Sequence, residues 1–439
     1  MAHAVDALKL EIIPEIEIVP IAGPLDARVV VPGSKSITNR AMILAAMAQG
    51  RSVIDSVLLS DDTRYMTDAL RVLGFIVEVD EDAHRITVGG RGGVIPTHGG
   101  EVFVGGAGTV MRFIVAMVTL GEGRFRIDGN QRMRQRPIGP QLDAMQRLGA
   151  SVYSERDNNC PPVIVDASRA RFEGGETSID ARVSSQFVSA MLMPAPIWKA
   201  GLKLRVIGDA ARPFIDMTLR LMEAWGTHNS VEGDQIVVPG GQWYRAQRFA
   251  VEPDASSASY FAAAAALIGG AVKIEGLTSN SVQGDLGFLG VLQRMGARVT
   301  WHPDYVEVVG TGELAGVDVA MNAMPDMVPT LAAIAPFASS PTKIRNVAFI
   351  RHHESDRIRV LSTELRRIGA DITETEDGLE IRPSTMRLAP IETYDDHRIA
   401  MSFAVTGLKL AGLKIKNPSC VAKTFPDFFT RLSALGGPS

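Results

Sequence analysis

A polar loop at residues 32–40 carries the first group of side chains that could do chemistry. Its sequence, Pro-Gly-Ser-Lys-Ser-Ile-Thr-Asn-Arg, runs directly into an apolar stretch that predicts a helix. A glycine-serine turn at a helix start leaves backbone N–H groups unpaired, and the helix dipole favours negative charge at that end. Lys35 adds a cation beside the turn, and Ser36 and Arg40 share one face of the first helical turn. The loop therefore predicts a binding site for an anion.

Two other interpretations of this loop are weaker. A nucleotide-binding P-loop requires adjacent Gly and Lys, whereas Ser34 separates Gly33 from Lys35. An ordinary helix cap with solvated charges would suffice if the loop stood alone. Candidate residues elsewhere in the chain are needed to distinguish such a cap from an anion site.

More cations lie near the starts of other predicted helices. A cation in the first turn of a helix opposes the helix dipole, so a purely structural reason for it is lacking. Arg132 and Arg134, which share a proline-glycine loop with Arg136, are expected to be solvated surface charges. The cations that we take as candidates for binding an anion are Lys35, Arg40, Arg112, Arg136, Arg357, Arg398 and Lys423.

Two acidic residues are candidates for proton transfer. Asp326 precedes an apolar helix, where it could be an N-cap or a catalytic base. Glu354 lies in Arg-His-His-Glu-Ser-Asp-Arg at residues 351–357, among groups suited to acid–base work. A metal site is the competing interpretation of the two histidines, but no cysteine and no second histidine pair supports it, so no metal is expected. His397 is expected to be a hydrogen-bonding residue at a helix terminus.

An internal repeat indicates which elements position these residues. An amphipathic helix that ends at a glycine and leads into a short strand recurs along the chain, and glycine suits the left-handed end of a helix. Its copies lie between 67 and 77 residues apart. The glycines are Gly74, Gly149, Gly226, Gly296, Gly369 and Gly436.

A second and more apolar helix precedes each of these amphipathic helices and begins at a polar residue. The helices that begin near Ser36, Ser185 and Ser257 are rich in alanine, methionine and leucine, which predicts burial on most sides. Six units divide most simply into three plus three, giving an α/β (α+β) fold of two domains. A cleft between the domains, facing the helix N-termini, is the expected site for an anionic ligand.

Composition narrows the class of protein. The chain has 439 residues, of which 46% are hydrophobic and 21% charged, which describes a globular protein with two cores. A net charge of −4 argues against nucleic acid as a partner. Two cysteines suit a reducing compartment, and the sequence contains neither a signal pattern nor a membrane-spanning apolar run. We expect a cytoplasmic protein without a membrane partner.

These motifs, taken together, resemble the 5-enolpyruvylshikimate-3-phosphate (EPSP) synthase family of enolpyruvyl transferases. The resemblance extends from about Gly23 to Leu435 and is carried by eight motifs in the family's order. They are residues 32–40, Ala-Gly-Thr-Val-Met-Arg at 107–112, Arg-Pro-Ile-Gly at 136–139, Ser-Ser-Gln-Phe at 184–187, Asp-Ala-Ser-Ser-Ala at 254–258, Glu-Ser-Asp-Arg at 354–357, Asp-His-Arg at 396–398 and Ala-Lys-Thr-Phe-Pro at 422–426.

The resemblance implies a fold, a reaction and a cellular context. The fold is an inside-out α/β barrel arrangement, with one domain at 34–252 and the other at 1–33 plus 253–439. The reaction moves the enolpyruvyl group of phosphoenolpyruvate to the 5-hydroxyl of shikimate 3-phosphate through a tetrahedral adduct and releases phosphate, without a metal or organic cofactor. The implied protein is a monomer of the shikimate pathway and a target of glyphosate, an inhibitor that competes with phosphoenolpyruvate.

Roles for individual residues are carried over from the family's motifs. Asp326 would accept the proton of the attacking hydroxyl, and Glu354 would exchange protons with the methylene carbon. Lys35 and His353 would assist catalysis. The residues implied to bind shikimate 3-phosphate are Lys35, Ser36, Arg40, Ser184, Ser185, Gln186, Asp326 and His353. The residues implied to bind phosphoenolpyruvate are Lys35, Gly108, Arg136, Gln186, Arg357, Arg398 and Lys423.

Several positions depart from the family's commonest pattern. Gly106, Ala211, Phe214 and Phe349 replace an asparagine, a serine, a tyrosine and another asparagine, which removes polar side chains. His353 stands where a lysine is common. A histidine carries a positive charge only when protonated, so this position predicts that turnover falls earlier on the alkaline side.

Two alternatives stay open at this point. UDP-N-acetylglucosamine enolpyruvyl transferase shares the fold, but it uses a cysteine in the loop that precedes the arginine equivalent to Arg136, and residues 131–135 contain none. A non-catalytic ligand-binding paralogue would explain the lost polar side chains. Asp326, Glu354 and the set of arginines favour the enzyme.

Overall fold

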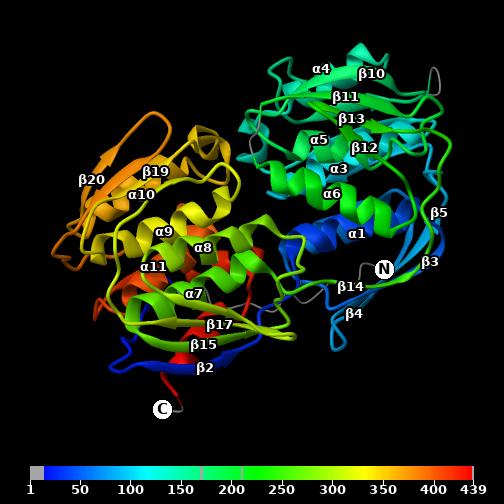
Figure 1. Ribbon diagram of the computed structural model, residues 1–439. Coiled ribbons are helices and arrows are strands. Elements are labelled where there is room, and N and C mark those ends of the chain that lie inside the picture. The colour runs from blue at the N-terminus through cyan, green and yellow to red at the C-terminus, as the bar shows by residue number, and fades with distance from the viewer. Residues whose placement is uncertain (1–13, 169–171, 209–210, 438–439) are drawn as a thin grey trace, which may run out of the picture.

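The chain forms two lobes, each with its own buried core. The computed structural model describes residues 14–168, 172–208 and 211–437. One hydrophobic core is built from residues between Ile37 and Val251. The other combines residues 18–31 with residues 258–435. Figure 1 shows the two lobes side by side, with the chain passing between them near α1 (Lys35–Met47) and β14 (Arg248–Ala250). The predicted α/β fold of two domains is confirmed.

A four-stranded sheet with two helices is the repeating unit. Within it, the first strand pairs in parallel with the second, and the remaining pairs are antiparallel. One unit consists of β6 (Gly99–Phe103), α3 (Gly108–Met117), β7 (Arg124–Asp128), α4 (Gly139–Arg147), β8 (Val152–Ser154) and β9 (Val163–Asp166). The sheet order is β6-β7-β9-β8, and the same pattern recurs in the other four-stranded sheets.

Two further units repeat this order along the chain. The first is β10 (Gly175–Asp180), α5 (Gln186–Leu192), β11 (Leu202–Ile207), α6 (Arg212–Ala224), β12 (Ser230–Glu232) and β13 (Gln235–Val238). The second is β18 (Asp318–Ala320), α9 (Val328–Ile334), β19 (Thr342–Arg345), α10 (Arg357–Arg367), β20 (Asp371–Glu374) and β21 (Leu379–Arg382).

The chain crosses twice between the lobes, once after β2 (Leu25–Val29) and once after β14, and each of these strands is the edge of a sheet in the lobe that the chain then leaves. The first lobe thus combines β14 (Arg248–Ala250) with α1 (Lys35–Met47), β3 (Gln49–Asp55), α2 (Asp61–Val72), β4 (Ile76–Asp80) and β5 (Arg85–Arg91). The second lobe combines β2 (Leu25–Val29) with α7 (Ala255–Ile268), β15 (Gly270–Glu275), α8 (Gly287–Arg294), β16 (Arg298–Trp301) and β17 (Tyr305–Gly310).

Hydrogen bonds join the two crossing segments. The Ser34 N–H donates to the Glu252 carbonyl and the Asp254 N–H donates to the Pro32 carbonyl, both at 2.8 Å. The Lys35 N–H also donates to the Asp254 carboxylate at 3.1 Å. The polar loop at residues 32–40 therefore lies where the chain passes from one lobe to the other.

The sixth unit is abbreviated. It comprises β1 (Glu15–Glu17), α11 (His397–Gly407), β22 (Lys414–Lys416) and α12 (Phe428–Ser433), and β1 and β22 form a two-stranded sheet. The repeated glycines Gly74, Gly149, Gly226, Gly296 and Gly369 have φ between 87° and 111° after their helices, as predicted. Gly436 differs, because it ends a 3-10 helix, Gly437 takes the positive φ, and no strand follows within the described residues.

The apolar helices lie inside each lobe. In α7 nearly every residue is buried, as expected for a helix that is apolar on all sides. In one lobe α3 contacts α1 and α5, and in the other α7, α9 and α11 contact one another. The packing of these apolar helices against one another directs their starts toward one region between the lobes.

Among the described residues, no helix has the length and apolar character needed to cross a membrane.

Candidate active site

Two adjoining cavities at the boundary between the lobes collect the predicted site residues. The first is lined by Lys35, Ser36, Arg40, Arg136, Ser184, Ser185, Gln186, Asp326, His353, Glu354, Arg357 and Arg398. The second, of about 420 Å³, shares Arg136 and Glu354 with the first and adds Lys423. Gly108 lies against the Arg136 guanidinium. Side chains that the sequence spreads over almost 400 residues thus meet at one place.

Arg357, the first residue of α10, contacts three carboxylates. Its guanidinium donates to Asp396 at 2.9 Å, to Asp326 at 2.8 Å and to Glu354 at 3.0 Å. Its side chain is 1% exposed. Burial by itself would lower the pKa of Arg357, but the three carboxylates raise it well above its ordinary value. Arg357 is therefore a permanent buried cation at the centre of the site.

Asp326 lies between two arginines. One carboxylate oxygen accepts from Arg357, and the other accepts from Arg398 at 2.8 Å. Burial opposes ionisation, yet Arg398 and Arg357 outweigh it and lower the pKa of Asp326 below its ordinary value. The start of α9 has no side-chain cap. Asp326 is therefore not an N-cap, and its ionised carboxylate faces the cavity.

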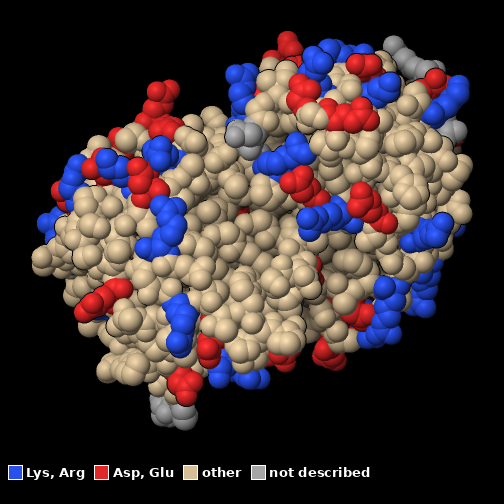
Figure 2. Space-filling model, in the orientation of Figure 1, with Lys and Arg blue, Asp and Glu red and all other residues tan. Residues whose placement is uncertain are grey.

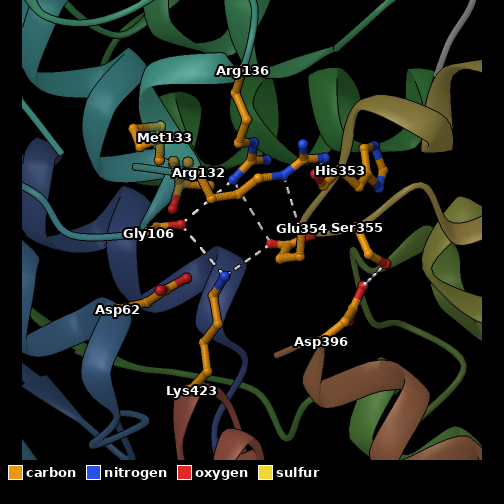
Figure 3. A network of polar contacts seen from close by, with 12 residues as sticks. Asp62, Gly106, Arg132, Met133, Arg136, His353, Glu354, Ser355, Asp396 and Lys423 are labelled. Atoms are coloured by element: carbon orange, nitrogen blue, oxygen red, sulfur yellow. Dashed lines mark hydrogen bonds and ion pairs between the residues drawn. The ribbon is translucent and has the colours of Figure 1, made fainter. Parts of the chain in front are cut away.

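Glu354 is the second ionised carboxylate of the site. Lys423 donates to it at 3.1 Å, and Arg136 lies 3.9 Å from the same oxygen, as Figure 3 shows. Burial would raise the pKa of Glu354, but Lys423, Arg357 and Arg136 hold it well below its ordinary value. The glutamate therefore bridges cations from both lobes.

Arg40 is buried, and its hydrogen-bond partners among the described residues include no carboxylate. Its guanidinium donates to Thr218 Oγ1 at 2.7 Å, Ser189 Oγ at 3.1 Å and the carbonyls of Ser36 and Phe214. Burial lowers its pKa to about 9. A buried cation whose partners are neutral favours an anion nearby. Arg40 therefore supports an anionic ligand on the α1 side of the cavity.

Lys35 has a counter-ion that the sequence did not reveal. Its Nζ lies 3.2 Å from a carboxylate oxygen of Asp62, which is buried in the first turn of α2. In the unit that contains α5, the Ser184 hydroxyl accepts from the Gln186 N–H at 3.2 Å, just where α5 begins. Lys35, Ser184 and Gln186 thus face the same cavity from different helices.

His353 is neutral, so the prediction of an alkaline loss of turnover is wrong in its premise. Burial, together with the neighbouring Arg357, lowers the pKa of His353 to about 4. Its Nδ1 lies 3.2 Å from Arg357 Nη1, a donor, so Nδ1 is the acceptor. The Phe349 ring packs edge-on against the imidazole at 6.0 Å. A histidine here is therefore a hydrogen-bonding group without charge at neutral pH.

Three of the departures from the family's commonest pattern form an apolar part of the wall of the first cavity. Ala211, Phe214 and Phe349 all line it. The Ala211 N–H donates to the Asn322 carbonyl at 2.8 Å, which adds a contact between the lobes. This wall supplies no side-chain donor to a ligand.

The prediction that His397 is a hydrogen-bonding residue at a helix terminus is wrong. Its imidazole is buried, neither ring nitrogen has a hydrogen-bond partner in the described part of the chain, and burial lowers its pKa well below the ordinary value. Asp396 has that role instead, because it accepts the N–H of Arg398 at the start of α11. Among the residues that the structure describes, no group of histidine, cysteine, aspartate and glutamate could hold a metal ion.

Residues that sequence reasoning missed complete the site. Asp396 lay in a recognised motif but had no role, and it is a buried partner of Arg357 and of the Ser355 hydroxyl. Arg132 was expected to be a solvated charge, which is wrong, because it donates to two carbonyls of the opposite lobe. Asp285 is buried with one oxygen unpaired. No local pattern distinguishes these residues from surface charges.

The charges of the site lie inside the molecule. Figure 2 shows lysine, arginine, aspartate and glutamate interspersed over one face, without a broad region of one sign. The concentrated charge is instead on the buried Arg40, Arg136, Arg357 and Arg398. An arrangement of this type can bind a small, multiply charged anion and exclude water from it, with two carboxylates available for proton transfer.

Comparisons with known proteins identify relatives over almost the whole chain. The family model described as EPSP synthase (3-phosphoshikimate 1-carboxyvinyltransferase) matches residues 19–432. The 3-phosphoshikimate 1-carboxyvinyltransferase of Nostoc punctiforme is 47% identical, over 95% of this chain and 98% of its own. The Yersinia pseudotuberculosis protein of that name is 44% identical, over 92% and 95%. A solved EPSP synthase from Acinetobacter baumannii has a TM-score of 0.79 at 26% identity, covering 96% of this chain and 98% of that one.

Proposed function

The chain belongs to the EPSP synthase family, and from this premise we propose how its site carries out the family's transferase reaction in the shikimate pathway. The reaction transfers the enolpyruvyl group of phosphoenolpyruvate to the 5-hydroxyl of shikimate 3-phosphate and releases phosphate. The observation that supports it best is the pair Asp326 and Glu354, each ionised and held by cations that meet where the lobes join.

The cations on the α10 and α11 side bind phosphoenolpyruvate. Its phosphate and carboxylate together need several positive groups, and arginine forks bind both planar and tetrahedral anions with paired hydrogen bonds. Arg136, Arg357, Arg398 and Lys423 line the cavities at this place, with Lys35, Gln186 and the backbone at Gly108 beside them.

Shikimate 3-phosphate occupies the α1 and α5 side. Ser184 and Ser185, just before α5, hold the phosphate, and Gln186 lies between the two substrates. Lys35, Ser36 and Arg40 contact the rest of the molecule. Asp326 and the neutral His353 reach the acceptor from the opposite lobe. Ala211, Phe214 and Phe349 contribute contact without hydrogen bonds, so this acceptor is held by fewer polar groups than the family pattern provides.

Binding of phosphoenolpyruvate activates the two carboxylates. Asp326 and Glu354 contact the cations that the substrate needs, and these contacts keep the pKa values of both carboxylates low. When the phosphate and carboxylate of the substrate take over Arg357, Arg398 and Lys423, both carboxylates lose their counter-ions and their pKa values rise. A stronger base then exists only when the substrate is present.

The two carboxylates act in an addition and an elimination. Asp326 takes the proton of the 5-hydroxyl as its oxygen bonds to C2 of phosphoenolpyruvate, and Glu354, which takes up a proton from solvent once its pKa has risen, gives that proton to the methylene carbon C3. In the elimination, Glu354 takes a proton back from C3, the C2–C3 double bond returns, and the C2–O bond to phosphate breaks. The arginines and Lys423 stabilise the charge on the departing phosphate.

The proposed organisation follows the two hydrophobic cores. We place one domain at 34–252 and the other at 1–33 plus 253–439, so that each substrate contacts both domains. We further propose that the protein acts as a monomer in the cytoplasm and is inhibited by glyphosate at the phosphoenolpyruvate site.

A phosphate-release assay tests the proposal. The purified protein is incubated with phosphoenolpyruvate and shikimate 3-phosphate, with UDP-N-acetylglucosamine as the control acceptor. Phosphate release only with shikimate 3-phosphate is expected, and Asp326→Asn should remove it while both ligands still bind. Binding of both ligands to the native protein without release would contradict catalysis and favour a ligand-binding paralogue.

A further inference from the structure

Arg132 joins the two lobes at the segment that carries Glu354. It lies just before the short 3-10 helix η2 (Met133–Gln135), in the lobe of the first core. Its Nη2 donates to the His353 carbonyl at 2.8 Å and its Nε donates to the Glu354 carbonyl at 3.0 Å. We propose that Arg132 is a positioning residue, which fixes the Glu354 backbone and makes the proton-transfer geometry depend on contact between the lobes. This inference rests on the proposed role of Glu354.

The two hydrogen bonds from Arg132 fix the orientation of the backbone at Glu354 as well as its distance from Arg132. One guanidinium fork binds two successive carbonyls, so it fixes the orientation of the peptide plane between His353 and Glu354 as well as its position. The Glu354 side chain starts from that backbone and meets Lys423 and Arg357 of its own lobe. Figure 3 shows Arg132 reaching this segment alongside Arg136. Arg132 of one lobe therefore holds the main chain of Glu354, and Lys423 and Arg357 of the other lobe hold mainly its carboxylate.

Arg134, two residues along the same loop, makes the contrast. Its guanidinium forms a paired contact with Asp128, at 2.9 Å and 2.6 Å, within its own lobe. The two arginines share chemistry and loop, but only Arg132 reaches the opposite lobe. Arg134→Ala is therefore a matched control for Arg132→Ala.

The inference is tested by turnover and by isotope exchange. Arg132→Ala should lower kcat by about 10- to 100-fold, the range expected when the energy of one hydrogen bond from a charged donor is lost from the transition state. The rate at which solvent deuterium enters the methylene of phosphoenolpyruvate, in the presence of shikimate 3-phosphate, should fall by the same factor. Affinity for shikimate 3-phosphate, measured by calorimetry without phosphoenolpyruvate, should stay within about twofold of native, and Arg134→Ala should match native in every measurement.

Two further variants separate positioning from charge and from general structure. Arg132→Lys keeps the charge but has one donor group, so most of the defect should persist. In Glu354→Gln, adding Arg132→Ala should lower kcat no further, because a residue that acts through Glu354 has nothing left to position. Multiplicative defects would overturn the inference, as would native kcat in Arg132→Ala or in Arg132→Lys.

The outcomes also distinguish this inference from the proposed function. If native protein releases no phosphate from the two substrates, the function itself is wrong. If native protein turns over and Arg132→Ala does too at the native rate, only the positioning role is wrong. Loss of shikimate 3-phosphate binding in Arg132→Ala would assign it a general structural role and overturn the inference.

Discussion

Gly108 controls where the Arg136 guanidinium can lie. A Cβ on Gly108 would be 2.8 Å from both Nη atoms of Arg136 and 3.0 Å from its Cζ. Ordinary van der Waals contact would require the guanidinium to withdraw by roughly 0.6 Å. Arg136 can do so at little cost, because its Nε has no hydrogen-bond partner among the described residues, and its Nη1 makes a weak 3.4 Å hydrogen bond with the Gly106 carbonyl and a 3.9 Å ion-pair contact with Glu354. The variant Gly108→Ala should therefore fold normally.

The displaced guanidinium should bind phosphoenolpyruvate less well. A hydrogen bond from a charged donor contributes about 1.5–3 kcal/mol, so weakening the contact with this substrate should raise its KM by about 10- to 100-fold. In the proposed arrangement shikimate 3-phosphate lies on the α1 and α5 side, so its dissociation constant should not change. An inhibitor that competes with phosphoenolpyruvate should lose affinity in the same direction.

Phosphate release at saturating shikimate 3-phosphate measures this effect. Gly106→Ala is the matched control in the same loop, because its Cβ would lie 3.2 Å from Asn130 Nδ2 and 4.0 Å from Lys423 Nζ, without reaching Arg136. The reasoning is refuted if Gly108→Ala leaves the KM for phosphoenolpyruvate within about twofold of native, or if Gly106→Ala raises it as much.

Three other predictions concern buried titratable residues. Because the pKa of His353 is lowered to about 4, NMR of its imidazole should show no titration between about pH 6 and 8, where an unperturbed histidine titrates; a midpoint in that range would contradict its neutrality. Asp396→Asn leaves Arg357 buried with one charge partner fewer, so urea unfolding should show about 3–5 kcal/mol less stability, and turnover should be lost. Burial and the nearby Asp326 raise the pKa of Asp285 to about 8; the stability from its neutral form is complete below the unfolded pKa of about 3.9 and is lost as pH rises toward 8. Asp285→Asn should therefore melt above native by a margin that widens from about pH 5 to 8, and an unchanging margin would show that the carboxyl is already ionised.

Local patterns in the sequence determined the elements and the position of the site. The turn at residues 32–40 leads into α1, and five of the six repeated glycines end their helices in the left-handed conformation. These features depend on a few neighbouring residues, because capping, backbone conformation and helix periodicity act over one or two turns. The same patterns identified the candidate cations and carboxylates, and the structure brings them together along the two cavities, except for Arg112, whose guanidinium donates to the carbonyls of Gly108 and Pro137.

Only the tertiary structure decided which charges meet and what state they take. Arg132 and Arg134 are indistinguishable in the sequence, yet one crosses to the opposite lobe and the other pairs with Asp128 beside it. His353 is neutral because it is buried against Arg357. Contact between distant segments and exclusion of water set both results, and neither is encoded in residue spacing. The sequence therefore determined which groups are available for catalysis, and the packing of two domains decided how each is held.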